Sequence, residues 1–238
     1  TPTVVRLVQK LGYKGYPDYQ QSLRAEVEMM LVSPLVKHDR WAGGVPETHI
    51  LNRFADQVVT NLQATLGQID HATFDAAAEL LADPGRHVFA MGGRITHAMA
   101  DYLVTLMKAV RPSVTLLSDL SNAWPPALLD MKAGDVLLVF DIRRYENSVL
   151  QVAEMAREQG AEIILITDRW VSPAAQLARH VLPCHIEAPS AWDSTVPLLV
   201  IVETLLASVQ ARTWTVTEGR LKRLEELYAR SRTFRRGR

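Results

Sequence analysis

The sequence of 238 residues contains a single cysteine, Cys184. One thiol excludes a disulfide within the chain and is typical of proteins kept in a reducing cytoplasm. Cys184 follows the strand-like residues 180–182, a position that favours buried packing. The sequence also lacks the cysteine and histidine spacing of zinc and iron–sulfur sites, so we predict neither a metal nor a cofactor.

Net charge is also absent, because 26 lysines and arginines balance 26 aspartates and glutamates. No global electrostatic field therefore attracts a polyanion. The charge is nevertheless unevenly distributed, since residues 1–14 carry Arg6, Lys10 and Lys14 but no acid. The residues after 229 carry five arginines and again no acid. Basic ends of this kind either contact nucleic acid or form a disordered, solubilising tail.

Long apolar runs and a recognisable signal peptide are missing as well. The longest apolar run, residues 196–202, is far shorter than the roughly 20 residues needed to cross a bilayer. We therefore expect a soluble, cytoplasmic protein with no membrane partner. The hydrophobic content of 48% suffices for one well-filled core and a small additional unit.

Short β-branched apolar segments alternate with helical patterns over residues 87–184. Strands are expected at 87–91, 114–118, 136–140, 162–167 and 180–184, with helices near 97–110, 147–159 and 172–179. Ser172 and Pro173 supply an N-cap and a first-turn proline for the last of these helices. Strands separated by single helices predict an α/β fold with a doubly wound, five-stranded parallel sheet.

Helical patterns also flank this alternation. Helices are expected at 1–12, 17–31, 48–68, 73–82, 190–212 and 215–230, with Thr1 as the cap of the first. The glycine- and proline-bearing stretch 37–47 predicts a linker between a helical unit, 1–36, and the α/β domain, 48–238. The apolar stripe of the first helix exceeds what the second helix can cover, so we expect further helices upstream in the natural chain.

A loop with two adjacent arginines follows the third expected strand. It contains Asp141, Arg143, Arg144 and Tyr145. In open α/β sheets ligands bind beyond the carboxyl ends of the strands, and guanidinium groups suit carboxylate or phosphate oxygens. Surface ion pairs are the alternative interpretation, which the sequence favours less.

A second unusual loop follows the first expected strand. It contains Gly92, Gly93, Arg94, Thr96 and His97. Paired glycines let the backbone approach a ligand closely, and the amides at the start of the next helix attract anions. A Gly-Gly turn that only ends a strand is the alternative.

The two loops together predict one crevice with a positive charge. It would contain three guanidinium groups, which Asp141 and Glu146 can neutralise only in part. We therefore expect the crevice to bind a small anion. Asp168, at the end of another strand, either lines this crevice or, as the sequence favours, caps the following turn.

Several motifs carry a resemblance to a known family. Residues 132–136 and 156–168, with Ser172 and Pro173, resemble a sugar isomerase (SIS) domain. The leucine–glycine–tyrosine–lysine–glycine–tyrosine turn at 11–16 resembles the end of the helix-turn-helix in RpiR-type bacterial transcriptional regulators. The resemblance implies a dimer, or a higher homo-oligomer, that binds operator DNA and whose SIS domain senses a sugar phosphate. It also implies that Thr3 and Arg6 face base edges while Lys10 and Lys14 face phosphates.

The loops depart from the family's pattern. Arg94 stands where the family has a serine, and residues 141–146 replace its serine–x–serine–glycine–x–threonine motif. Either the arginines replace these serines as anion ligands, or the site accepts something other than a sugar phosphate. We expect a regulator that is not an enzyme and senses an anionic, sugar-derived metabolite.

Two other functions remain open. One is an isomerase, which needs a general base; Glu146 and His97 are the candidates, although neither lies in a recognisable catalytic motif. The other is a SIS domain that serves only for dimerisation, for which the apolar helix from Val196 onward offers a surface.

Overall fold

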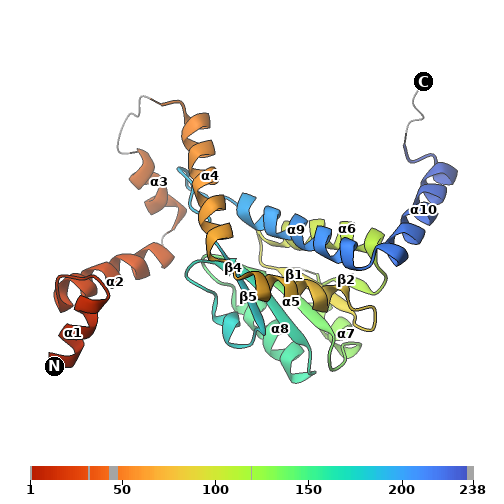
Figure 1. Cartoon of the computed structure of the whole chain (residues 1–238), viewed down its shortest axis with the longest axis horizontal. Helices are drawn as coiled ribbons and strands as arrows, with labels where there is room; N and C mark the ends of the chain where they lie inside the picture. Colours follow the sequence, from red (N-terminus) through yellow and green to blue (C-terminus); the bar gives the residue numbers. More distant parts are fainter. Residues whose placement is uncertain (1, 32, 43–47, 119, 235–238) are drawn as a thin grey trace. The chain divides into compact units, whose positions relative to one another are not determined.

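The computed structural model describes residues 2–31, 33–42, 48–118 and 120–234 (Figure 1). These residues form two compact units. The helical unit comprises the described residues up to 42 together with 189–192, and the sheet unit comprises 48–188 and the residues from 193 onward. The predicted cap Thr1 and the glycines and proline of the predicted linker lie outside the described residues.

The helical unit contains α1 (Pro2–Lys10), α2 (Tyr16–Leu31) and α3 (Pro34–Ala42). Gly12 ends the first helix with φ +93°, a left-handed conformation that glycine adopts without strain. Of the apolar stripe on α1, Val8 is buried and Leu7 and Leu11 stay exposed. The sequence missed α3, which occupies residues 37–42 of the predicted linker. The boundary between two functional domains at residue 48 stays a prediction.

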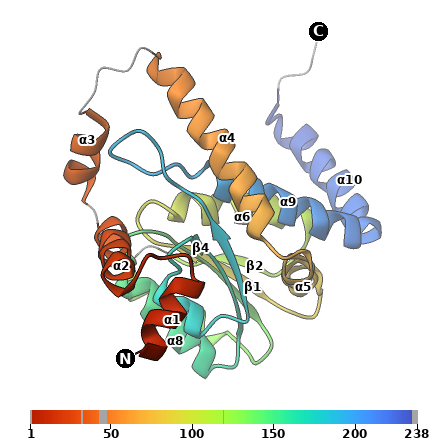
Figure 2. The ribbon, with the colours of Figure 1, turned by 60° about the vertical axis from the view of Figure 1, so that its left-hand side comes forward.

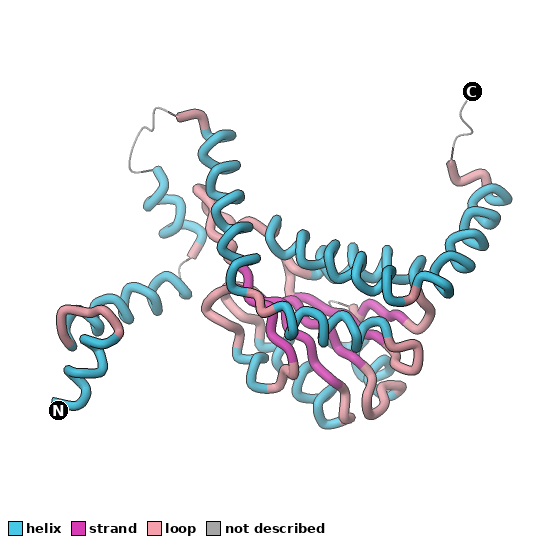
Figure 3. Tube along the Cα trace, viewed as in Figure 1, coloured by secondary structure: helices cyan, strands magenta, loops and turns pink. Residues whose placement is uncertain are grey.

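The sheet unit contains the predicted five-stranded parallel sheet, in the order β2-β1-β3-β4-β5 (Figure 3). Its strands are β1 (Val88–Gly92), β2 (Val114–Leu116), β3 (Val136–Asp141), β4 (Glu162–Asp168) and β5 (His180–Cys184). All six residues of β3 are buried, as expected for a central strand covered on both faces. Cys184 is buried as predicted, and this burial raises the pKa of its thiol to about 12.

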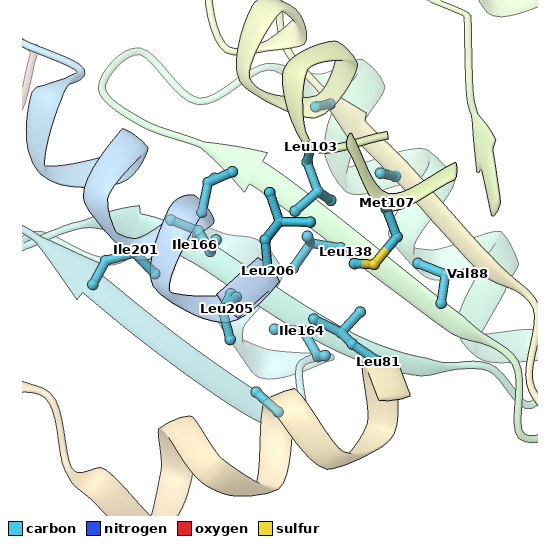
Figure 4. Close-up of a cluster of buried hydrophobic side chains, with 14 of the residues drawn as sticks. Leu81, Val88, Leu103, Met107, Leu138, Ile164, Ile166, Ile201, Leu205 and Leu206 are labelled. Atoms are coloured by element: carbon cyan, nitrogen blue, oxygen red, sulfur yellow. The ribbon is translucent and has the colours of Figure 1, made fainter. Parts of the chain in front are cut away.

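Helices cover both faces of the sheet. One face packs against α5 (His71–Ala82), α6 (His97–Val110) and α9 (Val196–Arg212), where Leu81, Leu103 and Leu205 meet Leu138 and Ile164 of the strands (Figure 4). The other face packs against α7 (Trp124–Leu129) and α8 (Asn147–Glu158). The sheet is therefore doubly wound, as the sequence predicted.

Two further helices flank α9. It lies between α4 (Ile50–Gln68) and α10 (Trp214–Ser231) in both views of the ribbon (Figure 2). Among the described residues no single helix is long and apolar enough to cross a membrane. The pair α9 and α10 reaches that length and composition only together, and it is bent by 104°.

Two helical predictions need correction, and two short elements were missed. The helix expected at 172–179 is a 3₁₀ turn, η2 (Pro173–Gln176), although Ser172 caps it as predicted through the N–H of Ala174. The helix expected from 190 begins only at Val196, because the Ser190 hydroxyl accepts the N–H of Trp192 and forms a local turn instead. The sequence also missed η1 (Ser121–Ala123) and α7, whose two prolines fit a first helical turn.

The strand order defines where the two unusual loops meet. β1 and β3 are neighbours, but β1 is followed by β2 on one side and β3 by β4 on the other. Such a switch in direction leaves the loops after the two strands free to separate, and ligands of open α/β sheets bind there. The loops 93–96 and 142–146 therefore lie at the switch point, on the carboxyl edge of the sheet.

Candidate functional site

The first loop is shaped by close backbone packing. A Cβ atom at Gly92 would lie 2.5 Å from the carbonyl carbon and oxygen of Thr96, so only glycine fits without a shift of the backbone. Thr96 is buried, and its hydroxyl donates to the carbonyl of Phe140 at 2.8 Å. These contacts fix the turn that presents the following residues.

The next residues of this loop differ in exposure. The Arg94 side chain is exposed, and its backbone N–H donates to Glu146 Oε1 at 2.7 Å. Gly93 lies directly beneath that carboxylate, since a Cβ there would approach Glu146 Oε1 to 2.7 Å. His97 is half-buried, and its Nδ1 has no hydrogen-bond partner within the described parts of the chain.

Asp141 is the last residue of β3 and lies buried at the start of the second loop. Its carboxylate accepts hydrogen bonds from the Ser172 hydroxyl and from the backbone N–H of Glu146. Burial raises the pKa of Asp141 to about 6, the two hydrogen bonds oppose this shift, and the charge of Asp168 adds to it. Asp141 therefore holds the loop in place and titrates near neutral pH.

Arg143 is ion-paired and largely buried. Its side chain is 8% exposed, its Nε lies 2.7 Å from Asp193 Oδ2, and its Nη2 lies 4.0 Å from Glu187 Oε1. The guanidinium also lies over the Trp170 ring, 4.4 Å from the centroid. The expectation that only Asp141 and Glu146 neutralise the arginines was therefore wrong.

Sequence reasoning missed these partners of Arg143. Glu187 and Asp193 follow β5, more than 40 positions away from Arg143, and no local pattern links them to it. Asp193 also lies within the helix expected over 190–212, and that prediction does not bring its carboxylate to the loop.

Asp168 fastens the second loop to the end of β4. Its carboxylate accepts the Tyr145 hydroxyl at 2.7 Å and the Arg143 N–H at 2.6 Å. It also accepts the Trp170 N–H at 3.0 Å, which is the capping role that the sequence favoured. Burial, together with the charge of Asp168, raises the pKa of Tyr145 far above its usual range. The Tyr145 phenol therefore stays neutral and acts as a donor.

Arg144 completes the set of predicted residues. It is exposed and has φ +61°, an uncommon conformation for a side chain other than glycine. The structure therefore brings the predicted residues of both loops to one edge, where the Arg94 and Arg144 side chains are exposed and the Arg143 side chain is largely buried. Within the described residues no cluster of acidic, histidine and cysteine side chains suits a metal ion.

The predicted DNA-binding residues lie in the helical unit. Thr3, Arg6 and Lys10 are exposed and share one face of α1, because their spacing of three and four follows the helical repeat. Lys14 is exposed in the turn before α2, where its backbone N–H donates to Asp18 Oδ2 at 2.9 Å. The four residues thus include three cations at one end of the chain.

The sheet unit also has a hollow of about 920 Å³ at the opposite, amino edge of the sheet. Arg86, Arg111 and Arg179 line it. Arg111 donates to the backbone carbonyls of Leu81 and Arg86, and Arg179 is 2.7 Å from Glu162 Oε1. These arginines therefore have internal partners, which makes the hollow a poorer anion site than the carboxyl edge.

Comparison with known proteins places the sheet unit in a family. The SIS domain profile matches residues 80–208, more than half of the chain. The chain belongs to the SIS domain family. Its similarity to named regulators extends further, since the HTH-type transcriptional regulator HexR of Escherichia coli strain K12 is 22% identical over 97% of this chain and 79% of its own length.

Solved structures agree on the fold. The sugar isomerase domain of the RpiR transcription factor from Sphaerobacter thermophilus is 24% identical, with a TM-score of 0.69 over 74% of this chain and 97% of that one. The Vibrio vulnificus NanR protein complexed with ManNAc-6P is 19% identical, with a TM-score of 0.65 over 95% of this chain and 80% of that one. Proteins named as sugar-phosphate isomerases also share the fold. Because these identities are low, the structures establish the fold alone.

Proposed function

We propose that this protein is a DNA-binding transcriptional regulator whose SIS domain senses a small, sugar-derived anion at the carboxyl edge of its sheet. The similarity to HexR, a helix-turn-helix regulator, supports the regulatory part because it spans both units of the chain. The two loops at the switch point support the sensing part. NanR, which has this fold, was solved with a sugar phosphate, which favours the same ligand class.

Within this site the predicted residues divide into three groups. Arg94 and Arg144 have exposed guanidinium groups and are the proposed contacts for the anionic group, with His97 as a further donor. Asp141, Arg143 and Tyr145 hold the second loop through Ser172, Asp193 and Asp168. Gly92, Gly93 and Thr96 shape the first loop.

A thermal-shift screen of sugar phosphates, sugar acids and free sugars tests the site. At about 100-fold above Kd, a bound ligand should raise the Tm of the wild type by roughly 5 °C. Arg94→Ala and Arg144→Ala should each weaken binding by roughly 10-fold or more, because each removes a charge-assisted contact. Arg157→Ala, on the exposed side of α8, is the matched control. Identical ligand responses of all four proteins would refute the site.

The proposed DNA contacts lie on α1 and in the turn that follows it. In the full-length protein Arg6→Ala should reduce the preference for operator over random DNA. Lys14→Ala should weaken binding to all sequences alike and reduce the salt dependence by about one unit of slope. Fluorescence anisotropy with selected and scrambled duplexes at several salt concentrations measures both effects. Equal losses on both duplexes in both variants would contradict the assignment.

We also propose a homodimer, although the apolar face of α9 expected to form its interface is not exposed. The apolar residues of α9 that suggested it, including Leu198, Val202 and Leu205, are buried within the sheet unit. Glu203 is exposed and accepts a hydrogen bond from Tyr102 of α6. Light scattering of the full chain tests the oligomeric state, and a monomer at micromolar concentration would refute the dimer.

The second candidate function is sugar-phosphate isomerisation, which the isomerases among the solved structures support. Glu146 is poorly placed as its general base, because its carboxylate already accepts the Arg94 N–H. Turnover of a sugar phosphate that disappears in Glu146→Gln would establish this alternative and overturn the assignment as a pure sensor.

A further inference from the structure

The side chain of Glu146 occupies an unusual position. It starts at the end of the second loop, yet its carboxylate lies in the turn of the first loop and accepts the Arg94 N–H at 2.7 Å. The Ser148 hydroxyl lies 3.4 Å from the other carboxylate oxygen. The backbone of Glu146 is held at the same time by Asp141, which accepts its N–H.

A carboxylate at this point has the character of a bound anion. The turn 93–96 leads directly into α6, and amides at the start of a helix attract negative charge. Gly93 leaves room for the carboxylate, because a Cβ there would come within 2.7 Å of Oε1 and 2.9 Å of Cδ. The backbone N–H that a bound phosphate would use is therefore already occupied by the protein itself.

We propose that Glu146 is an internal competitor for the ligand's anionic group and thereby sets the specificity of the site. An anion reaches the Arg94 N–H only when the Glu146 carboxylate leaves it. This inference rests on the proposed sensing function and adds to it the residue that limits anion affinity. It also explains why a carboxylate lies at the same edge as the two exposed arginines, one in each loop.

The exchange has a structural consequence for the second loop. Glu146 is the N-cap residue of α8, and its side chain is the link from the second loop to the Arg94 N–H. When an anion replaces the carboxylate, this link between the two loops is lost, while the bonds of Asp168 to Arg143 and Tyr145 stay intact. Ligand binding would therefore act first on residues 146–148, at the start of α8.

Binding of inorganic phosphate and of glucose 6-phosphate, with glucose as the uncharged comparison, tests this proposal. Isothermal titration would compare wild type, Glu146→Gln and Glu146→Ala. The glutamine variant keeps the shape and an acceptor for the Arg94 N–H but removes the charge, so it also controls for misfolding. Glu154→Gln, an exposed carboxylate on α8, is the matched control.

The proposal predicts that both Glu146 variants bind glucose 6-phosphate and phosphate roughly 10- to 100-fold more tightly than wild type, since a charge-assisted competitor is removed. Glu154→Gln should match the wild type, and no variant should gain affinity for glucose. If wild type and Glu146 variants bind the phosphates equally well, the competitor role is overturned while the sensing site stands. If none of the proteins binds any of the phosphates, both proposals fail for this ligand class.

Discussion

The loops after β1 and β3 each place an arginine beyond a parallel strand, but they use it in opposite ways. In the first loop the Arg94 side chain is exposed, and its backbone N–H donates to Glu146. In the second loop the Arg143 side chain is 8% exposed and pairs with Asp193 and Glu187. Arginines in the two loops thus differ: Arg143 is held by ion pairs within the protein, whereas Arg94 is the proposed ligand contact.

The largest expected effect is a difference in stability between variants of these two arginines. Arg143→Ala removes one partner of a largely buried ion pair and should lower the free energy of unfolding by about 3 kcal/mol. Arg94→Ala, at an exposed position, should change it by less than about 0.5 kcal/mol. Urea denaturation of both variants measures the difference. Equal and small losses would show that the Arg143 ion pair contributes nothing to the loop.

The second loop should also make the stability of the protein depend on pH, through Asp141. Its pKa is raised from 3.8 to about 6 in the folded protein, so the folded state favours the protonated carboxyl. This contribution is complete below about pH 4 and is lost as the pH rises through about 6, with a total of about 3 kcal/mol. The stability of the wild type relative to Asp141→Asn should therefore fall between pH 4 and pH 7. A pH-independent difference between the two unfolding curves would contradict the raised pKa.

The two glycines of the first loop give the smallest of these effects. Gly92→Ala would bring a methyl group within 2.5 Å of the Thr96 backbone and should cost about 1–3 kcal/mol. Gly93→Ala meets the far end of the Glu146 side chain, which can shift more easily than backbone, and should cost less than about 1 kcal/mol. Thermal melts rank the pair, and the opposite order would mean that the backbone of 92–96 adapts more easily than its packing indicates.

Much of the fold could be predicted from local patterns. The β-branched runs located all five strands, and Ser172 with Pro173 located a real cap. The errors have local causes too. Residues 173–176 form one 3₁₀ turn instead of a helix, and the short helix α7 was not predicted, although its two prolines fit a first turn.

The meeting of the two loops at one edge was predictable, whereas the ion pairs formed there were not. The carboxyl ends of neighbouring parallel strands must meet at one edge, so loops 92–97 and 141–145 could be brought together on the sequence alone. The carboxylates of Glu187 and Asp193 reach Arg143 through tertiary structure, which no local charge count includes. The hydrogen bond from the Arg94 N–H to Glu146 also depends on tertiary structure, because the register of β1 against β3 brings the two loops together.

A crystal structure of the protein with the anion that gives the largest thermal shift tests the central claim most directly. The account predicts that the anionic group lies at the carboxyl edge, within hydrogen-bonding distance of Arg94 or Arg144, with the Glu146 carboxylate moved off the Arg94 N–H. A ligand bound instead in the arginine-lined hollow at the amino edge, beside Arg86 and Arg111, with Glu146 still in place, would contradict it.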